Sequence, residues 1–283
     1  MKRKENISTL IGRGIVRILL ILWSLTIVFP LLWVFYTSFK TNKEFYANVW
    51  ALPENWRVEN YEFAWNTANF AAYFKNSLFT VVVTLVLTLL MTTTTAYILA
   101  KFKYRWLGVV RGFYTVVLAI PGVLILVPQY FMFLRMHMTD SLWALAMLYA
   151  LNSVPFTVFM QTGFMRSIND SLLEAASLDG ASQFQTFFRI VIPCVKPSLF
   201  VTILLNVLGT WNEYILALTF LSDENKYTVP IGLSQLQNAS TYKVEYGGLF
   251  AGLIIAMIPI LVIYAIFQKQ LQEGVVAEGG VKG

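Results

Sequence analysis

The stretch ILLILWSLTIVFPLLWVFYTSF occupies residues 18–39 and contains no charged residue. An apolar helix of about 20 residues crosses the hydrocarbon core of a bilayer, so this stretch predicts a transmembrane helix. It follows a basic start (Lys2, Arg3, Lys4), yet it is too long for the hydrophobic region of a cleavable signal peptide and lacks a small-residue cleavage site. We therefore expect an uncleaved membrane span.

Similar stretches recur along the rest of the chain. They are Asn76–Ala100, Gly112–Leu134, Ser141–Met165, Ser198–Phe220 and Tyr246–Gln268. Only Glu213 places a charge inside one of them, and the prolines within them are tolerated in membrane helices because neighbouring groups satisfy the freed carbonyls. With 57% hydrophobic and 13% charged residues, against about 25% charged in soluble domains, the sequence predicts an all-α membrane protein with six transmembrane helices.

Charge placement predicts how these spans are oriented. With the N-terminus in the cytoplasm, most of the 21 lysine and arginine residues fall in cytoplasmic segments, as the positive-inside rule requires. Residues 1–17 and 269–283 then form cytoplasmic terminal segments around a membrane domain of residues 18–268. The net charge of +6 is explained by this topology, so no nucleic-acid partner is expected.

The first outer loop, Lys40–Lys75, carries Trp50, Trp56 and Trp65. Tryptophans are enriched at membrane–water interfaces, so the loop fits an interfacial aromatic belt. A docking surface for an external partner is the alternative.

The long cytoplasmic loop, residues 166–197, predicts two short helices. Ser171 and Glu174 have the spacing of a capping box that starts the first helix, and Gly180 suits the left-handed position after its end. Leucines and alanines make this helix apolar on nearly every side, although it lies outside the bilayer. Two interpretations follow: it docks into a groove of another protein, or it forms an interfacial re-entrant turn.

The second helix of this loop should begin at another capping box, Ser182 with Gln185. Phe184, Phe187, Phe188 and Val191 then fall on one helical face, which we expect to bury against the membrane helices. Pro193 and Pro197 should end this helix before the fifth span.

These residues carry a family resemblance. Glu174-Ala175-Ala176, then Gly180 and Ile190-Val191-Ile192-Pro193, resemble the EAA signature of binding-protein-dependent ABC importer permeases, with Ile192 in place of leucine. Asp179 beside Gly180, Asn76-Ser77 and Trp211–Tyr214 make the chain most similar to maltose-type permeases for di- and oligosaccharides. The resemblance implies the type I importer permease fold.

The resemblance also implies partners and roles. The partners would be a second permease subunit in a heterodimer, an ABC ATPase dimer, an extracytoplasmic sugar-binding protein and membrane lipid. Coupling to the ATPase would fall to Glu174, Ala175, Ala176, Asp179 and Gly180, with further contacts from the tail, Gln272–Gly283. The sequence has no G-x-x-x-x-G-K-[ST] loop, so we expect ATP and Mg to bind the partner ATPase. We expect no cofactor in this chain and no enzymatic activity of its own.

Polar residues in the spans are the remaining candidates. With one cysteine and one histidine, no metal site is expected. Glu213, with Trp211, Asn212 and Asn152, could line a substrate pathway, or Glu213 could be satisfied by a neighbouring helix. For Asn152, Gln161 and Asn206 we favour hydrogen bonds between helices. The alternative function is an ion-coupled secondary carrier that uses Glu213.

Overall fold

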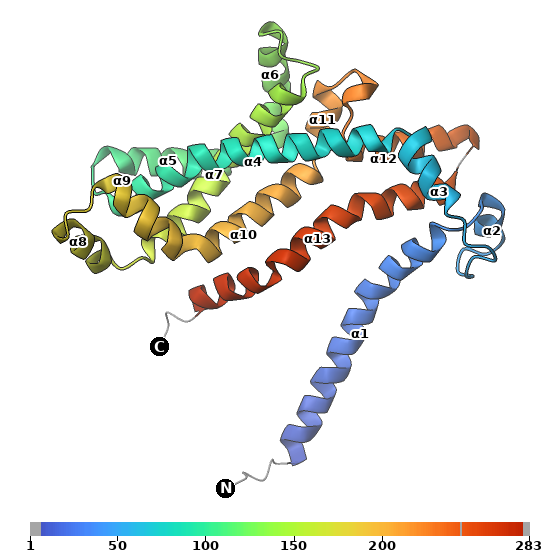
Figure 1. Cartoon of the computed structure of the whole chain (residues 1–283), viewed down its shortest axis with the longest axis horizontal. Coiled ribbons are helices and arrows are strands. Elements are labelled where there is room, and N and C mark those ends of the chain that lie inside the picture. Colours follow the sequence, from blue (N-terminus) through green and yellow to red (C-terminus); the bar gives the residue numbers. More distant parts are fainter. Residues whose placement is uncertain (1–6, 244, 280–283) are drawn as a thin grey trace. The chain divides into compact units, whose positions relative to one another are not determined.

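The computed structural model describes residues 7–243 and 245–279, with side chains for 12–237 and 245–269. Within those ranges the regular structure is entirely helical, which confirms the predicted fold class (Figure 1). The elements are α1 (Ile7–Thr37), α2 (Asn42–Ala47), α3 (Glu59–Glu62), η1 (Phe63–Thr67), α4 (Phe70–Lys101), α5 (Trp106–Leu118), α6 (Gly122–Arg135), α7 (Leu142–Arg166), α8 (Asp170–Leu178), α9 (Gln183–Thr186), η2 (Phe187–Val191), α10 (Ile192–Trp211), α11 (Ile215–Phe220), η3 (Glu224–Lys226), α12 (Val229–Lys243) and α13 (Tyr246–Gly279).

Five helical stretches are long and apolar enough to cross a membrane. They are Gly12–Thr37, Phe70–Lys101, Leu142–Arg166, Gln183–Trp211 and Tyr246–Lys269. A sixth span is obtained if α5 and α6, which meet at a bend of 100°, count as one. The prediction of a continuous third span was therefore wrong. Pro121 explains the break, because the residue before a proline is driven out of the helical region of backbone space.

The helix of the first span begins earlier than predicted, at Ile7, inside the segment 1–17. The last helix, α13, continues past the predicted end of the sixth span, and its backbone is described as far as Gly279. The predicted ATPase-contacting tail, Gln272–Gly283, therefore has only backbone described, and its last four residues lie outside the described residues.

The chain forms two compact units. One contains Met1–Asn69 and Leu233–Met257, and the other contains Phe70–Gly232 and Ile258–Gly283. In the first unit, the buried side chain of Asn60 fixes the turn after α1, because its Nδ2 donates to the carbonyls of Ser38 (2.8 Å) and Lys40 (2.9 Å). In the same loop Trp50 and Trp56 stay more than half exposed, a placement compatible with either interpretation of this loop.

In the second unit, α4 and α7 pack along much of their length. Threonines at four-residue intervals in α4 are buried there, namely Thr80, Thr84, Thr88 and Thr92. The Thr84 hydroxyl donates to the carbonyl of Ala146 in α7 at 3.1 Å. Small side chains let membrane helices approach closely, and the Thr84 bond shows one such approach between α4 and α7.

One apolar cluster joins the ends of α4, α7 and the α9–α10 segment. Its buried members are Ala96, Tyr97, Met165, Ile168, Phe187, Val191 and Val195. Leu173 of α8 packs against this cluster. The short helix α8 is thereby seated on the ends of the long helices (Figure 1).

A polar latch closes the loop between α6 and α7 onto the loop after α11. The Asp140 carboxylate accepts hydrogen bonds from the amides of Ser222 and Asp223 (both 3.0 Å) and from Lys226 Nζ (2.7 Å). Burial alone would raise its pKa, but the bonds from Lys226 and the two amides outweigh burial and lower the pKa of Asp140 from 3.8 to about 2.

Candidate functional site

Helix α8 starts at a different residue from the one predicted. Asn169 is the N-cap, and its Oδ1 accepts the amide of Ser171 at 3.1 Å. The predicted capping box of Ser171 and Glu174 is therefore wrong. Asn169 is as good a cap as serine, and its position makes Asp170 the first helical residue, where a carboxylate suits the positive end of the helix dipole. Glu174 has no capping role and lies exposed.

The end of α8 agrees with the prediction. Gly180 has φ +78°, the left-handed conformation that glycine adopts without steric cost. The amide of Ala181 donates to the carbonyl of Ala176 (3.0 Å), and the amide of Gly180 donates to that of Ser177 (3.1 Å). These two bonds are the Schellman motif, which satisfies carbonyls at the helix end.

The surface of α8 separates the predicted coupling residues into two groups. Glu174, Ala175 and Asp179 lie exposed, whereas Ala176 is only 6% exposed. Leu178 is 88% exposed, an unusual state for a leucine at the end of a nine-residue helix. Within the described chain, Ala176 is therefore buried in the packing of α8, whereas the face around Ala175 and Leu178 is not covered.

Lys101, the last residue of α4, holds α8 in place. Its Nζ donates to the carbonyl of Ile168 and to Asp170 Oδ1 (2.7 Å), and its side chain is only 6% exposed. The hydrogen bond and the charge of Lys101 lower the pKa of Asp170. In the sequence, Lys101 is one of the basic residues that predict the topology, and its position at the end of a span is the one available hint of this anchor.

The second helix of the loop follows the prediction only in part. Ser182 and Gln185 form the expected capping box. Phe187 and Val191 are buried, but Phe184 and Phe188 are 73% and 52% exposed, so the single buried stripe was wrong. The π-helical turn η2 explains the difference, because a wider turn breaks the 3.6-residue spacing on which the stripe depended.

The predicted helix end before the fifth span was also wrong. The helical segment Gln183–Trp211 runs without a break, with Pro193 in the first turn of α10 and Pro197 within it. Pro193 lies just after the π-helical turn η2, so the backbone hydrogen bond that a proline cannot make is missing next to a turn whose pairing is already irregular.

The fifth span breaks instead at Asn212–Tyr214, between α10 and α11. The Glu213 carboxylate caps α11: Oε1 accepts the amide of Leu216 (2.7 Å), and Oε2 accepts the amide of Ala217 (3.0 Å) and the hydroxyl of Tyr149. An anion at a helix N-terminus is favoured by the free amides and the dipole. The hydrogen bonds of Glu213 are thus made to α11, which follows it directly, and to Tyr149 of α7.

A cavity of about 280 Å³ adjoins this break, and its lining includes Asn152 and Glu213. Trp211 is only 4% exposed and packs edge-to-face on Phe74 (5.5 Å between ring centroids), and Asn212 Nδ2 donates to the carbonyl of Leu208 (2.9 Å). Of the four predicted pathway residues, Asn152 and Glu213 line this cavity and also a second one of about 450 Å³, whereas Trp211 and Asn212 line neither of the two.

Two of the three predicted hydrogen bonds between helices are present. Asn152 Oδ1 accepts from Gln129 Nε2 (2.7 Å), and Asn206 Nδ2 donates to Thr157 Oγ1 (3.1 Å). Gln161 is fully buried, and its amide oxygen and nitrogen have no hydrogen-bond partner among the described residues. The prediction for Gln161 was therefore wrong.

Comparison with known proteins decides what kind of molecule carries these features. Residues 92–276 match the family described as the binding-protein-dependent transport system inner membrane component. This chain belongs to that family. The permease is thus a multi-pass inner-membrane protein, and nothing in the comparisons favours an ion-coupled carrier.

Two relatives resemble the permease over nearly its whole length. The diacetylchitobiose uptake system permease protein NgcG of Streptomyces coelicolor is 33% identical over 261 residues, which are 92% of this chain and 86% of the relative. The probable ABC transporter permease protein YurM of Bacillus subtilis is 35% identical over 288 residues, 100% of this chain and 93% of the relative.

A solved structure has the same fold. It is a bacterial ABC transporter involved in the import of the acidic polysaccharide alginate, and its matched chain is 22% identical with a TM-score of 0.81, over 95% of the permease and 100% of that chain. A second structure of an alginate ABC transporter, in complex with a pentasaccharide-bound periplasmic protein, matches with a TM-score of 0.68 at 15% identity, over 95% and 99% of the two chains. At these identities the likeness speaks for the fold.

Proposed function

We propose that the permease is a membrane subunit of an ATP-driven importer of di- or oligosaccharides. Its support is the family match together with relatives named for the uptake of such sugars. Because its sequence has no phosphate-binding loop, ATP and Mg would bind a separate ATPase dimer. A second permease subunit and an extracytoplasmic sugar-binding protein complete the proposed assembly.

Helix α8 is the proposed contact with the ATPase. The observation that carries this proposal is the exposure of Leu178 at the end of a helix that is otherwise fixed by Lys101 and the Schellman turn. An uncovered leucine beside an exposed alanine is a small apolar knob suited to a cleft in another protein. Glu174 and Asp179 would add polar contacts at its edge, Ala176 would seat the helix, and Gly180 would shape its end.

The proposed orientation follows the positive-inside rule. Both termini and residues 166–197 would face the cytoplasm, where an ATPase can reach α8. The cavity beside Asn152 and Glu213 would then form part of the substrate pathway, with Trp211 and Asn212 supporting its wall from the break between α10 and α11.

Charging the exposed face of α8 tests this function. Ala175→Asp and Leu178→Asp place a carboxylate where the ATPase should bury an apolar group, so we expect loss of ATPase co-purification from the native membrane and loss of sugar uptake. The matched control is Ala47→Asp, the same change at an exposed alanine in α2.

The abundance of each variant in the membrane fraction separates lost docking from lost folding. We expect normal abundance, because both positions are exposed. Retention of the ATPase and of uptake in both variants at normal abundance would exclude α8 as the coupling contact.

A further inference from the structure

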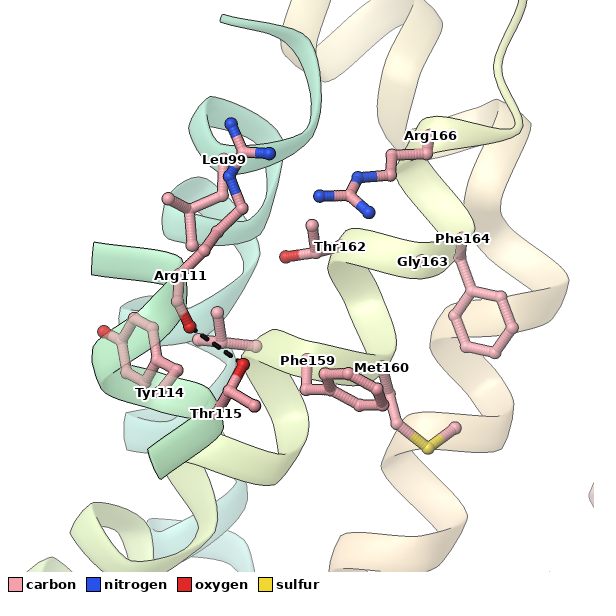
Figure 2. Close-up of a pocket in the computed structure, with 11 residues that line it drawn as sticks. Leu99, Arg111, Tyr114, Thr115, Phe159, Met160, Thr162, Gly163, Phe164 and Arg166 are labelled. Carbon is pink, nitrogen blue, oxygen red and sulfur yellow. Dashed lines mark hydrogen bonds between the residues drawn. The ribbon is translucent and has the colours of Figure 1, made fainter. Parts of the chain in front are cut away.

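A cavity of about 500 Å³ lies between α5 and α7 in the second unit, away from α8 and from Glu213. Figure 2 shows Arg111 extending from α5 and Arg166 from the end of α7, with both guanidinium groups directed toward the space beside Thr162. Below them, Phe159 and Met160 give the cavity apolar walls. The cavity therefore has a cationic end and an apolar end.

The described residues place no negative charge at the cationic end. No acidic side chain lines the cavity, and neither arginine forms an ion pair within the part of the chain that the structure describes. Arg111 Nε and Thr162 Oγ1 are buried there and have no hydrogen-bond partner among the described residues. Buried polar groups without partners cost free energy, so an anion with several acceptor oxygens would stabilise this end.

The position of the two arginines matches the depth of a lipid headgroup. Arg166 is the last residue of a membrane span, and Arg111 lies within the second turn of α5. Just before it, Tyr104 and Trp106 are 58% and 59% exposed and stack on each other, as interfacial aromatic residues do. The apolar walls lie deeper along α7, where an acyl chain would run.

We propose that this cavity binds one anionic phospholipid. Its phosphate would accept hydrogen bonds from Arg111, Arg166 and the Thr162 hydroxyl, and an acyl chain would cover Phe159 and Met160. Basic pockets between membrane helices are known to suit anionic headgroups. A small soluble anion would leave the apolar walls uncovered, which favours the lipid. The proposal rests on the membrane placement of α5 and α7 and is independent of the sugar, the ATPase and α8.

Two kinds of variant remove the site by opposite means. Arg111→Gln with Arg166→Gln removes the charge and keeps the space. Gly163→Leu fills the space and keeps the charge: Gly163 lines the cavity, and a Cβ built there meets nothing within 4 Å. Arg105→Gln is the matched control, since Arg105 is exposed near the same membrane face and does not line the cavity.

Native mass spectrometry of the full-length chain, with the subunits that co-purify, measures retained lipid after addition of phosphatidylglycerol or phosphatidylcholine with matched acyl chains. We expect one tightly held phosphatidylglycerol, with binding about fivefold weaker for each arginine removed. Gly163→Leu should abolish binding, and Arg105→Gln should leave it unchanged.

Three outcomes would overturn the proposal. They are equal retention of the two lipids, unchanged phosphatidylglycerol binding in Gly163→Leu, and competition by glycerol phosphate without acyl chains, which would assign the site to a soluble anion. A fourth result, no retained lipid at all, would also overturn the proposal; it is expected if an acidic side chain of a co-purifying subunit occupies the cavity. Because ATPase co-purification is scored on the same sample, failure of the lipid site and failure of the proposed function give different results.

Discussion

Replacing Gly180 by alanine should loosen the end of α8 without disturbing the rest of the fold. Gly180 has φ +78°, and an alanine pays about 1–2 kcal/mol in the left-handed region. A Cβ at this position meets nothing within 4 Å, so the whole cost is backbone strain and no clash adds to it. Because α8 is short and surface-exposed, we expect this cost to appear as local opening.

Hydrogen exchange measures that opening. The amides of Gly180 and Ala181 donate to carbonyls of α8, so their exchange should accelerate about 5- to 30-fold, since 1.4 kcal/mol corresponds to tenfold. Gly180→Asn should have a smaller effect, because asparagine tolerates the left-handed region better than alanine. Exchange within α7 should not change.

Gly163→Ala is the matched control for this experiment. Gly163 lies within the helix α7, and an added Cβ also meets nothing within 4 Å, so alanine should stabilise the helix slightly. Equal exchange in the wild type, Gly180→Ala and Gly180→Asn would refute the reasoning. So would acceleration throughout the second unit, because the strain would then not be local.

Three further predictions concern the latch and the buried polar groups. Asp140→Asn should remove about 1 kcal/mol of stability after allowance for solvent screening. Because folding lowers the pKa of Asp140, this stabilisation is present above pH 3.8 and is lost as the pH falls to about 2. The thermal unfolding temperature of the variant should therefore depend less on pH in that window than that of the wild type. Glu213→Gln should lower thermal stability by about 1–3 kcal/mol, because three hydrogen-bond donors lose their carboxylate acceptor. Uptake by this variant should still depend on ATP and not on an ion gradient. Gradient-driven uptake in vesicles without ATP would contradict this. A double-mutant cycle of Thr157→Val and Asn206→Leu should give a coupling of about 0.6 kcal/mol, and additive effects would show that their bond contributes nothing.

Local signals in the sequence were sufficient for much of the fold. Four of the six spans could be located from charge-free runs, since a bilayer demands that length and composition. Gly180 and the Ser182–Gln185 box were predictable because caps depend on residues close together in the chain. Where two caps compete locally, as Asn169 and Ser171 do, spacing alone could not choose between them.

Features that depend on distant packing could not be predicted. The anchor between Lys101 and Asp170 joins residues 69 positions apart, and no local pattern encodes it. The π-helical turn that exposes Phe184 and Phe188 arises where α9 joins α10 over the apolar cluster. The capping role of Glu213 required knowledge that the span breaks just there, which composition did not reveal.

The anchor at Lys101 has a mechanical consequence. One ammonium group ties together the last residue of α4, the carbonyl that follows α7, and the first residue of α8. A displacement of α8 would therefore move the ends of α4 and α7 together, because this anchor leaves no flexible connection between the three helices. Replacing this lysine by methionine would leave the small helix in contact with its neighbours and yet uncouple its movement from theirs.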